Sequence, residues 1–331
     1  MKKLLINTAI AALATGSAFA ADLPSHKAPY IAPPPPPMWT GFYAGLNAGY
    51  SFGMNNSVTT TVGAAQDGLA ALLPGLLIPG SSALANAGVA NITRNGFIGG
   101  AQVGYNYQWG SSYVIGIEAD LQGAGIRGSG GNGGFAQDGF ALGGGALSVT
   151  RTSAGFNDIN AGIDWMGTVR GRVGYLFTPT MLLYGTGGLA YGGTYANTTN
   201  SLNHIVNVGI LPPLANITAT FPTVAGVGRQ SDTLLGWTAG AGFEWMLSPG
   251  WSLKAEALYY DLGTVSFGST GVAAVSPINV ALLGGAVNIL GGSLLTNVPT
   301  TRIQYDGVMA RAGVNYHFNF GGGAAPVMAG Y

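Results

Sequence analysis

Cysteine is absent from this chain of 331 residues, which excludes a disulfide framework, a thiolate metal site and a cysteine nucleophile. Charge is also scarce, because only 7% of the residues are Asp, Glu, Lys or Arg, whereas a soluble domain carries about 25%. The 12 acidic and 12 basic residues leave no positive excess that would hold nucleic acid. Hydrophobic residues make up 47% of the chain, and this composition argues against an ordinary cytosolic enzyme.

The first twenty residues predict an export signal. Lys2 and Lys3 precede the short apolar stretch Leu4–Ala14, and Ala18–Ala20 forms an A-x-A cleavage pattern. The run Pro33–Pro37 favours an extended spacer over a packed element. We therefore divide the chain into a signal peptide at 1–20, a Pro-rich periplasmic tether at 21–38, an outer-membrane β-barrel at 39–320 and a Gly-rich C-terminal tail at 321–331.

Eight segments alternate apolar residues with small or polar ones, which is the period-2 pattern of a strand with two different faces. In Tyr113–Gly128, for example, Ile115 and Ile117 alternate with Glu118 and Asp120. The eight segments are Trp39–Gly53, Asn95–Gly110, Tyr113–Gly128, Asp164–Phe177, Met181–Thr194, Thr233–Leu247, Trp251–Phe267 and Arg302–Phe318.

The polar faces of these segments carry a balanced set of charges, four of each sign. A water-soluble sandwich would also alternate, but a balanced set is expected in a narrow, enclosed interior, where an unpaired charge is costly. We predict an ionic network inside a barrel, in which the arginines pair with interior carboxylates. Its members are Glu118, Asp120, Arg170, Arg172, Glu244, Lys254, Glu256 and Arg311.

Aromatic residues gather near the ends of the segments, including all six tryptophans. Outward rings at both ends of apolar strands form the girdles of a transmembrane barrel, because amphipathic rings favour the headgroup level. The predicted girdle consists of Trp39, Trp109, Tyr113, Trp165, Phe177, Trp237, Trp245, Trp251, Tyr316 and Phe318.

The connections between segments predict the topology. Three are tight and rich in turn-forming residues, namely Ser111–Ser112, Thr178–Thr180 and Ser248–Gly250. Four are long, namely Met54–Arg94, Ser129–Ile163, Tyr195–Asp232 and Gly268–Thr301. Short periplasmic turns and long extracellular loops are the outer-membrane arrangement. We predict an all-β, eight-stranded, antiparallel, up-and-down transmembrane barrel in the cell outer membrane, with both mature termini in the periplasm.

Several motifs resemble one known family over nearly the whole mature chain. They are ADLP after the signal, Trp39–Gly45, Val169–Tyr175, Tyr260–Gly263 and Val314–Phe318. Together they are similar to the small outer-membrane β-barrel surface antigens of alphaproteobacteria, which are related in fold to the OmpA-like transmembrane domain and often labelled porin-like. The resemblance implies an eight-stranded barrel, an outer-membrane location and structural or surface roles, and it supplies no catalytic residues.

Two features depart from that pattern. Such barrels usually end on an aromatic residue that the insertion machinery reads, but here Gly321–Tyr331 follows Phe320, so Tyr331 or an internal Phe must serve. The loops are also more apolar than expected, since Leu69–Ile78, Ile205–Pro213 and Gly271–Leu295 carry no charge.

Barrel size gives the functional expectation. A lumen of about eight strands is filled by side chains, whereas open channels appear at about sixteen to eighteen, so we expect a structural and surface protein with little or no pore activity. One alternative is a general diffusion porin, with extra strands such as Ile217–Val224 hidden in the loops. A second is an outer-membrane enzyme whose loop-rim site would use Ser201, His204, Asp158 or Asp232; we interpret these four as solvated loop residues.

Cofactors and partners follow from the same interpretation. We expect no cofactor and no metal, and Gly128–Gly133 matches G-x-G-x-x-G without the following helix that dinucleotide binding requires. The expected partners are outer-membrane lipid and lipopolysaccharide, the barrel-insertion machinery, and either peptidoglycan or a host surface. We expect no binding to nucleic acid.

Overall fold

The computed structural model describes residues 39–62, 85–210, 215–220, 222–274, 278–282, 285–289 and 295–318. The signal peptide, the tether, the tail and the apolar segment Leu69–Ile78 of the sequence analysis lie outside these residues. The chain divides into two compact units, Met1–Pro36 and Pro37–Tyr331, and the description below concerns the second. In its described part, no helix has the length and apolar character needed to cross a bilayer.

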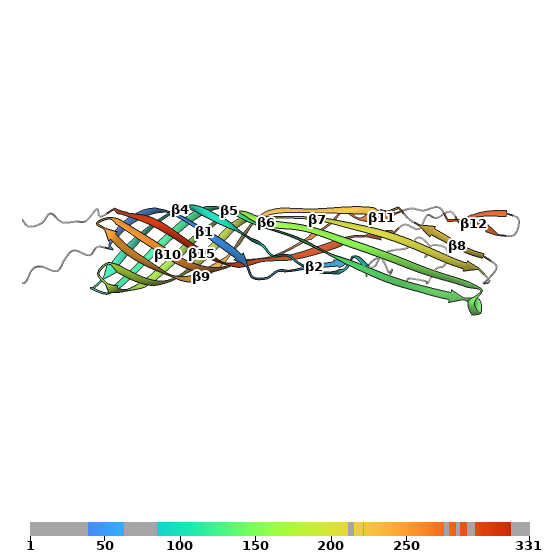
Figure 1. Cartoon of the computed structure of the whole chain (residues 1–331), viewed down its shortest axis with the longest axis horizontal. Helices are drawn as coiled ribbons and strands as arrows, with labels where there is room; N and C mark the ends of the chain where they lie inside the picture. Colours follow the sequence, from blue (N-terminus) through green and yellow to red (C-terminus); the bar gives the residue numbers. More distant parts are fainter. Residues whose placement is uncertain are drawn as a thin grey trace, which may run out of the picture. The chain divides into compact units, whose positions relative to one another are not determined.

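Eight antiparallel strands form a closed ring (Figure 1). Its order is β1, β4, β5, β6, β7, β9, β10 and β15, and β15 pairs back onto β1 from Phe42↔Phe318 to Gly53↔Gly307. The ring strands are β1 Gly41–Gly53, β4 Asn95–Trp109, β5 Tyr113–Leu142, β6 Leu147–Thr178, β7 Met181–Ile210, β9 Val224–Ser248, β10 Trp251–Gly268 and β15 Pro299–Phe318. Each contains most of one predicted segment, so the predicted eight-stranded, up-and-down barrel is confirmed.

Shorter elements lie in the connections at one end of the ring. They are β2 Ser57–Val62, β3 Gly88–Asn91, β8 Ala215–Thr220, β11 Val272–Ala274, β12 Ile278–Leu282, β13 Gly285–Ile289, β14 Leu295–Asn297 and the 3-10 turn Gly143–Gly145. β8 overlaps the segment that a wider porin would need as an extra ring strand, but among the described residues it pairs with β7 alone, off the ring path. We call this end of the barrel the extended end, and the end with the three tight connections the turn end.

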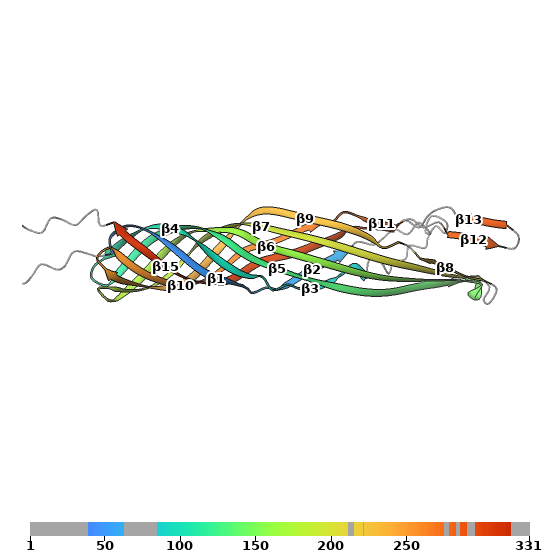
Figure 2. The ribbon, with the colours of Figure 1, turned by 45° about the horizontal axis from the view of Figure 1, so that its top comes forward.

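Two ring hairpins are much longer than the sequence analysis predicted (Figure 2). Most of Ser129–Ile163, expected to be a loop, is strand, because β5 and β6 stay paired from Ser129↔Asn160 to Leu142↔Leu147. Much of Tyr195–Asp232 is also strand, since β7 pairs with β9 as far as Leu202↔Val224. These stretches are rich in Gly, Asn, Ser and Thr, so they lack the apolar alternation from which strands are recognised.

The glycine-rich part of β5 makes room for a segment that leads into β4. Residues 85–93 run along the inner side of the long hairpin, and a Cβ at Gly134 would overlap the carbonyl oxygen of Ala85. Carbons added at Gly128 or Gly130 would likewise press on Thr93 and Asn91. Close approach of two backbones is therefore the structural reason for the glycine run.

Most of the predicted girdle residues lie on the outside of the ring. Trp109, Tyr113, Phe177, Trp251 and Phe318 are exposed near the turn end. Towards the other end, Trp237 is exposed, while Trp165 is half-buried against Tyr191. Trp165 pairs with Gly123, ten residues along β5 from Tyr113, and a rise of about 3.4 Å per residue at a tilt of about 45° converts this to roughly 24 Å. This height matches the apolar band of an outer-membrane barrel, which is about 25 Å tall.

Trp39 is a correction, because it does not belong to the outward girdle. Its ring is 1% exposed and packs inside the turn end with Leu182, Tyr184 and Met246. Its Nε1 donates a hydrogen bond of 2.9 Å to the carbonyl oxygen of Pro179. Gly41, with φ of 141°, lies between Trp39 and the rest of β1 in a conformation that glycine adopts readily. Trp39 precedes the first ladder pairs of β1, so strand alternation does not determine which side of the ring its side chain faces.

Candidate functional site

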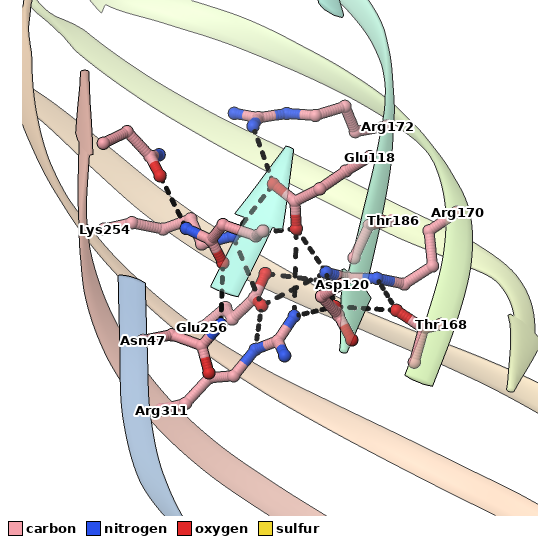
Figure 3. Close-up of polar contacts among 12 residues, drawn as sticks. Asn47, Glu118, Asp120, Thr168, Arg170, Arg172, Thr186, Lys254, Glu256 and Arg311 are labelled. Carbon is pink, nitrogen blue, oxygen red and sulfur yellow. Dashed lines mark hydrogen bonds and ion pairs between the residues drawn. The ribbon is translucent and has the colours of Figure 1, made fainter. Parts of the chain in front are cut away.

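Eight charged side chains meet in the middle of the barrel interior, and all of them except Glu244 are labelled in Figure 3. They are those singled out in the sequence analysis, and none is more than 5% exposed. Each lies on the inward face of a strand, and the register places opposite charges directly across from each other. The facing pairs are Glu118↔Arg170, Glu244↔Lys254 and Glu256↔Arg311. Cross-strand pairing of this kind is the unit from which a sheet builds side-chain contacts.

Arg170 has the most acidic neighbours. Its guanidinium forms ion pairs with Glu118, with Asp120 at 3.1 Å and with Glu256 at 3.3 Å. Its Nε donates to the hydroxyl of Thr168 at 2.9 Å. Carboxylates from β5 and β10, on different sides of the ring, therefore converge on one cation from β6.

Arg311 and Lys254 complete the links across the lumen. Arg311 pairs with Asp120 at 2.6 Å and with Glu256. Lys254 lies 2.8 Å from Glu118 and 3.5 Å from Glu256. Because Glu118 and Glu256 each contact several cations, the eight side chains form one network and not four separate pairs. We call it the lumen network.

Arg172 is held between two aromatic rings. Its guanidinium carbon lies 4.1 Å from the ring centroid of Tyr184 and 5.6 Å from that of Tyr43, within the range of cation–π attraction. Its Nη2 donates to Glu244 at 2.6 Å. The two hydroxyls extend the network, since Tyr43 donates to Glu118 at 2.6 Å and Tyr184 to Glu256 at 2.9 Å.

The sequence analysis did not assign Tyr43, Tyr184 and His317 to the network. Glu244 accepts hydrogen bonds from Ser252 at 2.6 Å and from Asn315 at 2.7 Å, and His317 lies 3.3 Å away. A usable signal existed for Tyr43, which is an even number of residues from Asn47 and therefore shares its face.

Apolar side chains close the lumen on both sides of the network. At the turn end, Trp39 packs with Val114, Leu176, Leu182, Tyr184 and Met246. Towards the extended end, a larger buried cluster includes Ile98, Ile126, Met166, Leu258, Ile303 and Met309. Val58 and Ile92, from the connection between β1 and β4, belong to this second cluster. The network therefore lies between two layers of buried apolar side chains.

Arg94 joins three segments beside the second layer. Its guanidinium donates to the carbonyl oxygens of Asn55 and Gln304 at 2.6 and 2.7 Å and lies 5.4 Å from the ring centroid of Tyr305. Burial lowers the pKa of Arg94 from its ordinary value, and attraction to Tyr305 partly offsets this. An arginine stays charged despite such a shift, so Arg94 is a cationic tie between the β1–β4 connection and β15.

The residues considered for an enzyme site do not come together. His204, on β7, is buried and its Nδ1 lies 2.7 Å from Ser153 Oγ on β6. Asp158, also on β6, is exposed. Ser201 donates to the carbonyl oxygen of Phe156, and Asp232 accepts from Gln230. The interpretation of these four as loop residues is wrong, because all of them lie on strands β6, β7 and β9. His204 is also not solvated, since it is buried.

Comparison with known proteins identifies the family. The sequence model of one protein family, the outer membrane protein beta-barrel domain, matches residues 38–318. These residues include every strand of the ring and the whole lumen network. The chain belongs to this outer-membrane β-barrel family.

Two curated relatives are similar to this chain over most of their own length. The chain is 32% identical over 265 residues to the 31 kDa outer-membrane immunogenic protein of Brucella melitensis biotype 1, covering 79% of this chain and 88% of that protein. The protein of the same description from Brucella suis biovar 1 matches equally. The resemblance to alphaproteobacterial surface antigens is therefore confirmed, and neither relative is named as an enzyme.

Solved structures also match most of the chain, at low sequence identity and low TM-score. OprG of Pseudomonas aeruginosa is 12% identical with a TM-score of 0.33, covering 84% of this chain and 97% of that one. Ail, the attachment invasion locus protein of Yersinia pestis, is 11% identical with a TM-score of 0.25, covering 84% and 99%.

Proposed function

We propose that this barrel is a structural and surface protein of the outer membrane with little or no pore activity. The observation that carries the proposal is the lumen network held between two apolar layers. A solute crossing the barrel would have to displace paired charges that are each at most 5% exposed, and separating buried pairs costs several kcal/mol. Its contribution would be to envelope integrity and to contacts made by the extended end.

The orientation that we propose places the turn end and both mature termini in the periplasm. Short turns face that side in barrels of this class, and β1 begins and β15 ends there. The long hairpin of β5 and β6 then projects among lipopolysaccharide or towards a host surface. The tether and tail would face peptidoglycan, and the C-terminal residues would be read by the insertion machinery.

Single-channel recording in planar bilayers tests the closed lumen. We expect silence or rare, small events from the purified protein, because the ring has eight strands and a lumen of this size is filled by side chains. A general diffusion porin, inserted under the same conditions, is the positive control. Large, stable conductance steps from this protein would support the porin alternative and contradict the proposal.

A further inference from the structure

The ladder between β9 and β10 stops although both strands continue. The two strands are paired as far as Asp261↔Trp237. Beyond that pair, β10 stays paired with β15 and β9 with β7 to the far ends of both strands. Among the described residues, the facing segments 228–236 and 262–268 share no ladder pair. We call these two segments the unpaired stretch.

β9 follows a longer path than β10 along the unpaired stretch. The chains meet again where the N–H of Thr270 donates to the carbonyl oxygen of Val227 at 2.8 Å. From Trp237 to Val227 the chain takes ten residue steps, whereas from Asp261 to Thr270 it takes nine. A register shift around Gly263, whose φ is 88°, takes up one of the nine. β9 is therefore bowed between its two contacts with the other chain segment.

The wall covers the interior incompletely at this stretch. Leu234, Val265 and Phe267 pack against the larger buried cluster, yet each is only half-buried. Leu262, in the same cluster, is 2% exposed, and a Cβ added to Gly192 of β7 would lie 3.3 Å from its Cδ1. Because β9 stands between β10 and β7 in the ring, the side chain of Leu262 passes behind β9. An opening between β9 and β10 would therefore expose it.

A clasp closes the far end of the unpaired stretch. Besides accepting from Thr270, Val227 donates its own N–H to the hydroxyl of Thr270 at 2.9 Å. Both residues are exposed. Exposed hydrogen bonds add little net stability, since water can replace them, so the chains can separate here at small cost. The near end is held by the last ladder pair.

The lining indicates what such an opening would admit. The inward side chains Leu234, Val265 and Phe267 lead to the buried apolar cluster, and a charged solute would lose its hydration against them. On the outside, the stretch begins at Trp237 of the girdle and continues with Leu235, which is 69% exposed. It therefore borders the lipid-facing surface, where apolar molecules dissolved in a bilayer collect.

We propose that the unpaired stretch is a lateral gate that admits small apolar molecules from the membrane boundary to the larger buried cluster. The gate opens when β9 and β10 separate at the clasp. It leads to the extended-end side of the lumen network, so it goes beyond the proposed function and operates whether or not the lumen conducts.

Cysteine modification tests the gate in a chain that has no cysteine of its own. Leu262→Cys and Leu258→Cys are each reconstituted into lipid vesicles and treated with methyl methanethiosulfonate, which is small and apolar. Leu258 is the matched control, because it is buried in the same cluster and on the same strand but is paired on both sides, with Gly240 and Met309. We expect Leu262→Cys to react roughly tenfold faster, since opening there breaks fewer hydrogen bonds.

Two further comparisons test what passes the gate and what closes it. Methanethiosulfonates with a sulfonate or a quaternary ammonium group should modify Leu262→Cys more slowly than the apolar reagent. Both signs are needed, because the exposed Asp232 would attract the cation. Thr270→Val removes the hydroxyl of the clasp and should raise the rate of the apolar reagent roughly threefold. Thr264→Val, at an exposed position of β10, should leave that rate unchanged.

Three outcomes would overturn the proposal. Equal rates in Leu262→Cys and Leu258→Cys would mean that the wall opens no more easily here than between paired strands. Faster modification by either charged reagent would mean an aqueous route. Equal effects of Thr270→Val and Thr264→Val would mean that the clasp does not hold the gate. Conductance is a separate measurement, so an open lumen would contradict the proposed function alone. The gel shift on boiling confirms that each variant is folded.

Discussion

Arg170 shows what burial demands of a single side chain in this barrel. It is 2% exposed and contacts carboxylates from two strands. Removing a charge from water costs more than one ion pair returns unless further hydrogen bonds complete the geometry. The carboxylates, the tyrosine hydroxyls and Thr168 supply those bonds here, so the network is most sensitive to the loss of one partner.

The first prediction concerns the replacement Arg170→Ala. We expect it to lower the free energy of unfolding by about 3–5 kcal/mol, because it leaves buried carboxylates uncompensated. Urea titration of the protein refolded into lipid vesicles measures the change. Arg302→Ala is the matched control, since Arg302 is exposed on β15 and a surface substitution usually changes stability by no more than about 0.5 kcal/mol. Equal effects of the two variants would contradict the role of the network.

At the scale of the element, the hairpin of β5 and β6 combines two different tasks. Near the turn end its strands alternate lipid-facing and lumen-facing side chains, as in Ile117 and Glu118. Beyond Gly128 the inner side of β5 has glycines in place of larger side chains, and the backbone of residues 85–93 packs directly against them. Adjacent glycines in this stretch therefore have different requirements, since successive residues point to opposite faces.

The second prediction uses two neighbouring glycines of β5. Gly134→Ala should destabilise the extended end by about 1–3 kcal/mol, because its Cβ would overlap Ala85 and force the backbones apart. Gly133→Ala should be tolerated, since its Cβ would lie 3.6 Å from Phe156 and from the carbonyl oxygen of Gly155. Hydrogen exchange of peptides from Ser129–Phe140 measures both. Equal protection from hydrogen exchange at 129–140 in the two variants would count against this interpretation. So would a difference in protection between them within the membrane belt.

At the scale of the whole molecule, closure of β1 onto β15 distinguishes a barrel from an open sheet. The two strands pair over Phe42–Gly53, so the ring has no free edge, and its inward side chains are shielded by the strands themselves. Opening the ring would expose backbone groups to lipid, where each unsatisfied group costs several kcal/mol. We therefore expect resistance to detergent to depend on this seam between residues far apart in the chain.

The third prediction concerns this seam. The folded protein should migrate differently on a denaturing gel before and after boiling, because a closed barrel keeps its structure in detergent until it is heated. Leu46→Pro should abolish the shift, since proline removes a ladder hydrogen bond in the middle of β1. Thr223→Pro is the control, because Thr223 lies between β8 and β9 outside any strand. A retained shift in Leu46→Pro would show that closure at this seam is not required.

The amino-acid sequence by itself determined the eight amphipathic strands, the three tight turns and the charges of the interior. Alternation is a local property with a period of two residues, so it can be recognised without knowing what each strand pairs with. Tertiary structure decided which charges meet, because partners such as Arg170 and Glu256 come from strands that only closure of the ring brings together. It also decided that Trp39 turns inward, where no ladder fixes its side. Finally, only the fold extended the strands through glycine-rich stretches, because a residue without a side chain carries no pattern to alternate.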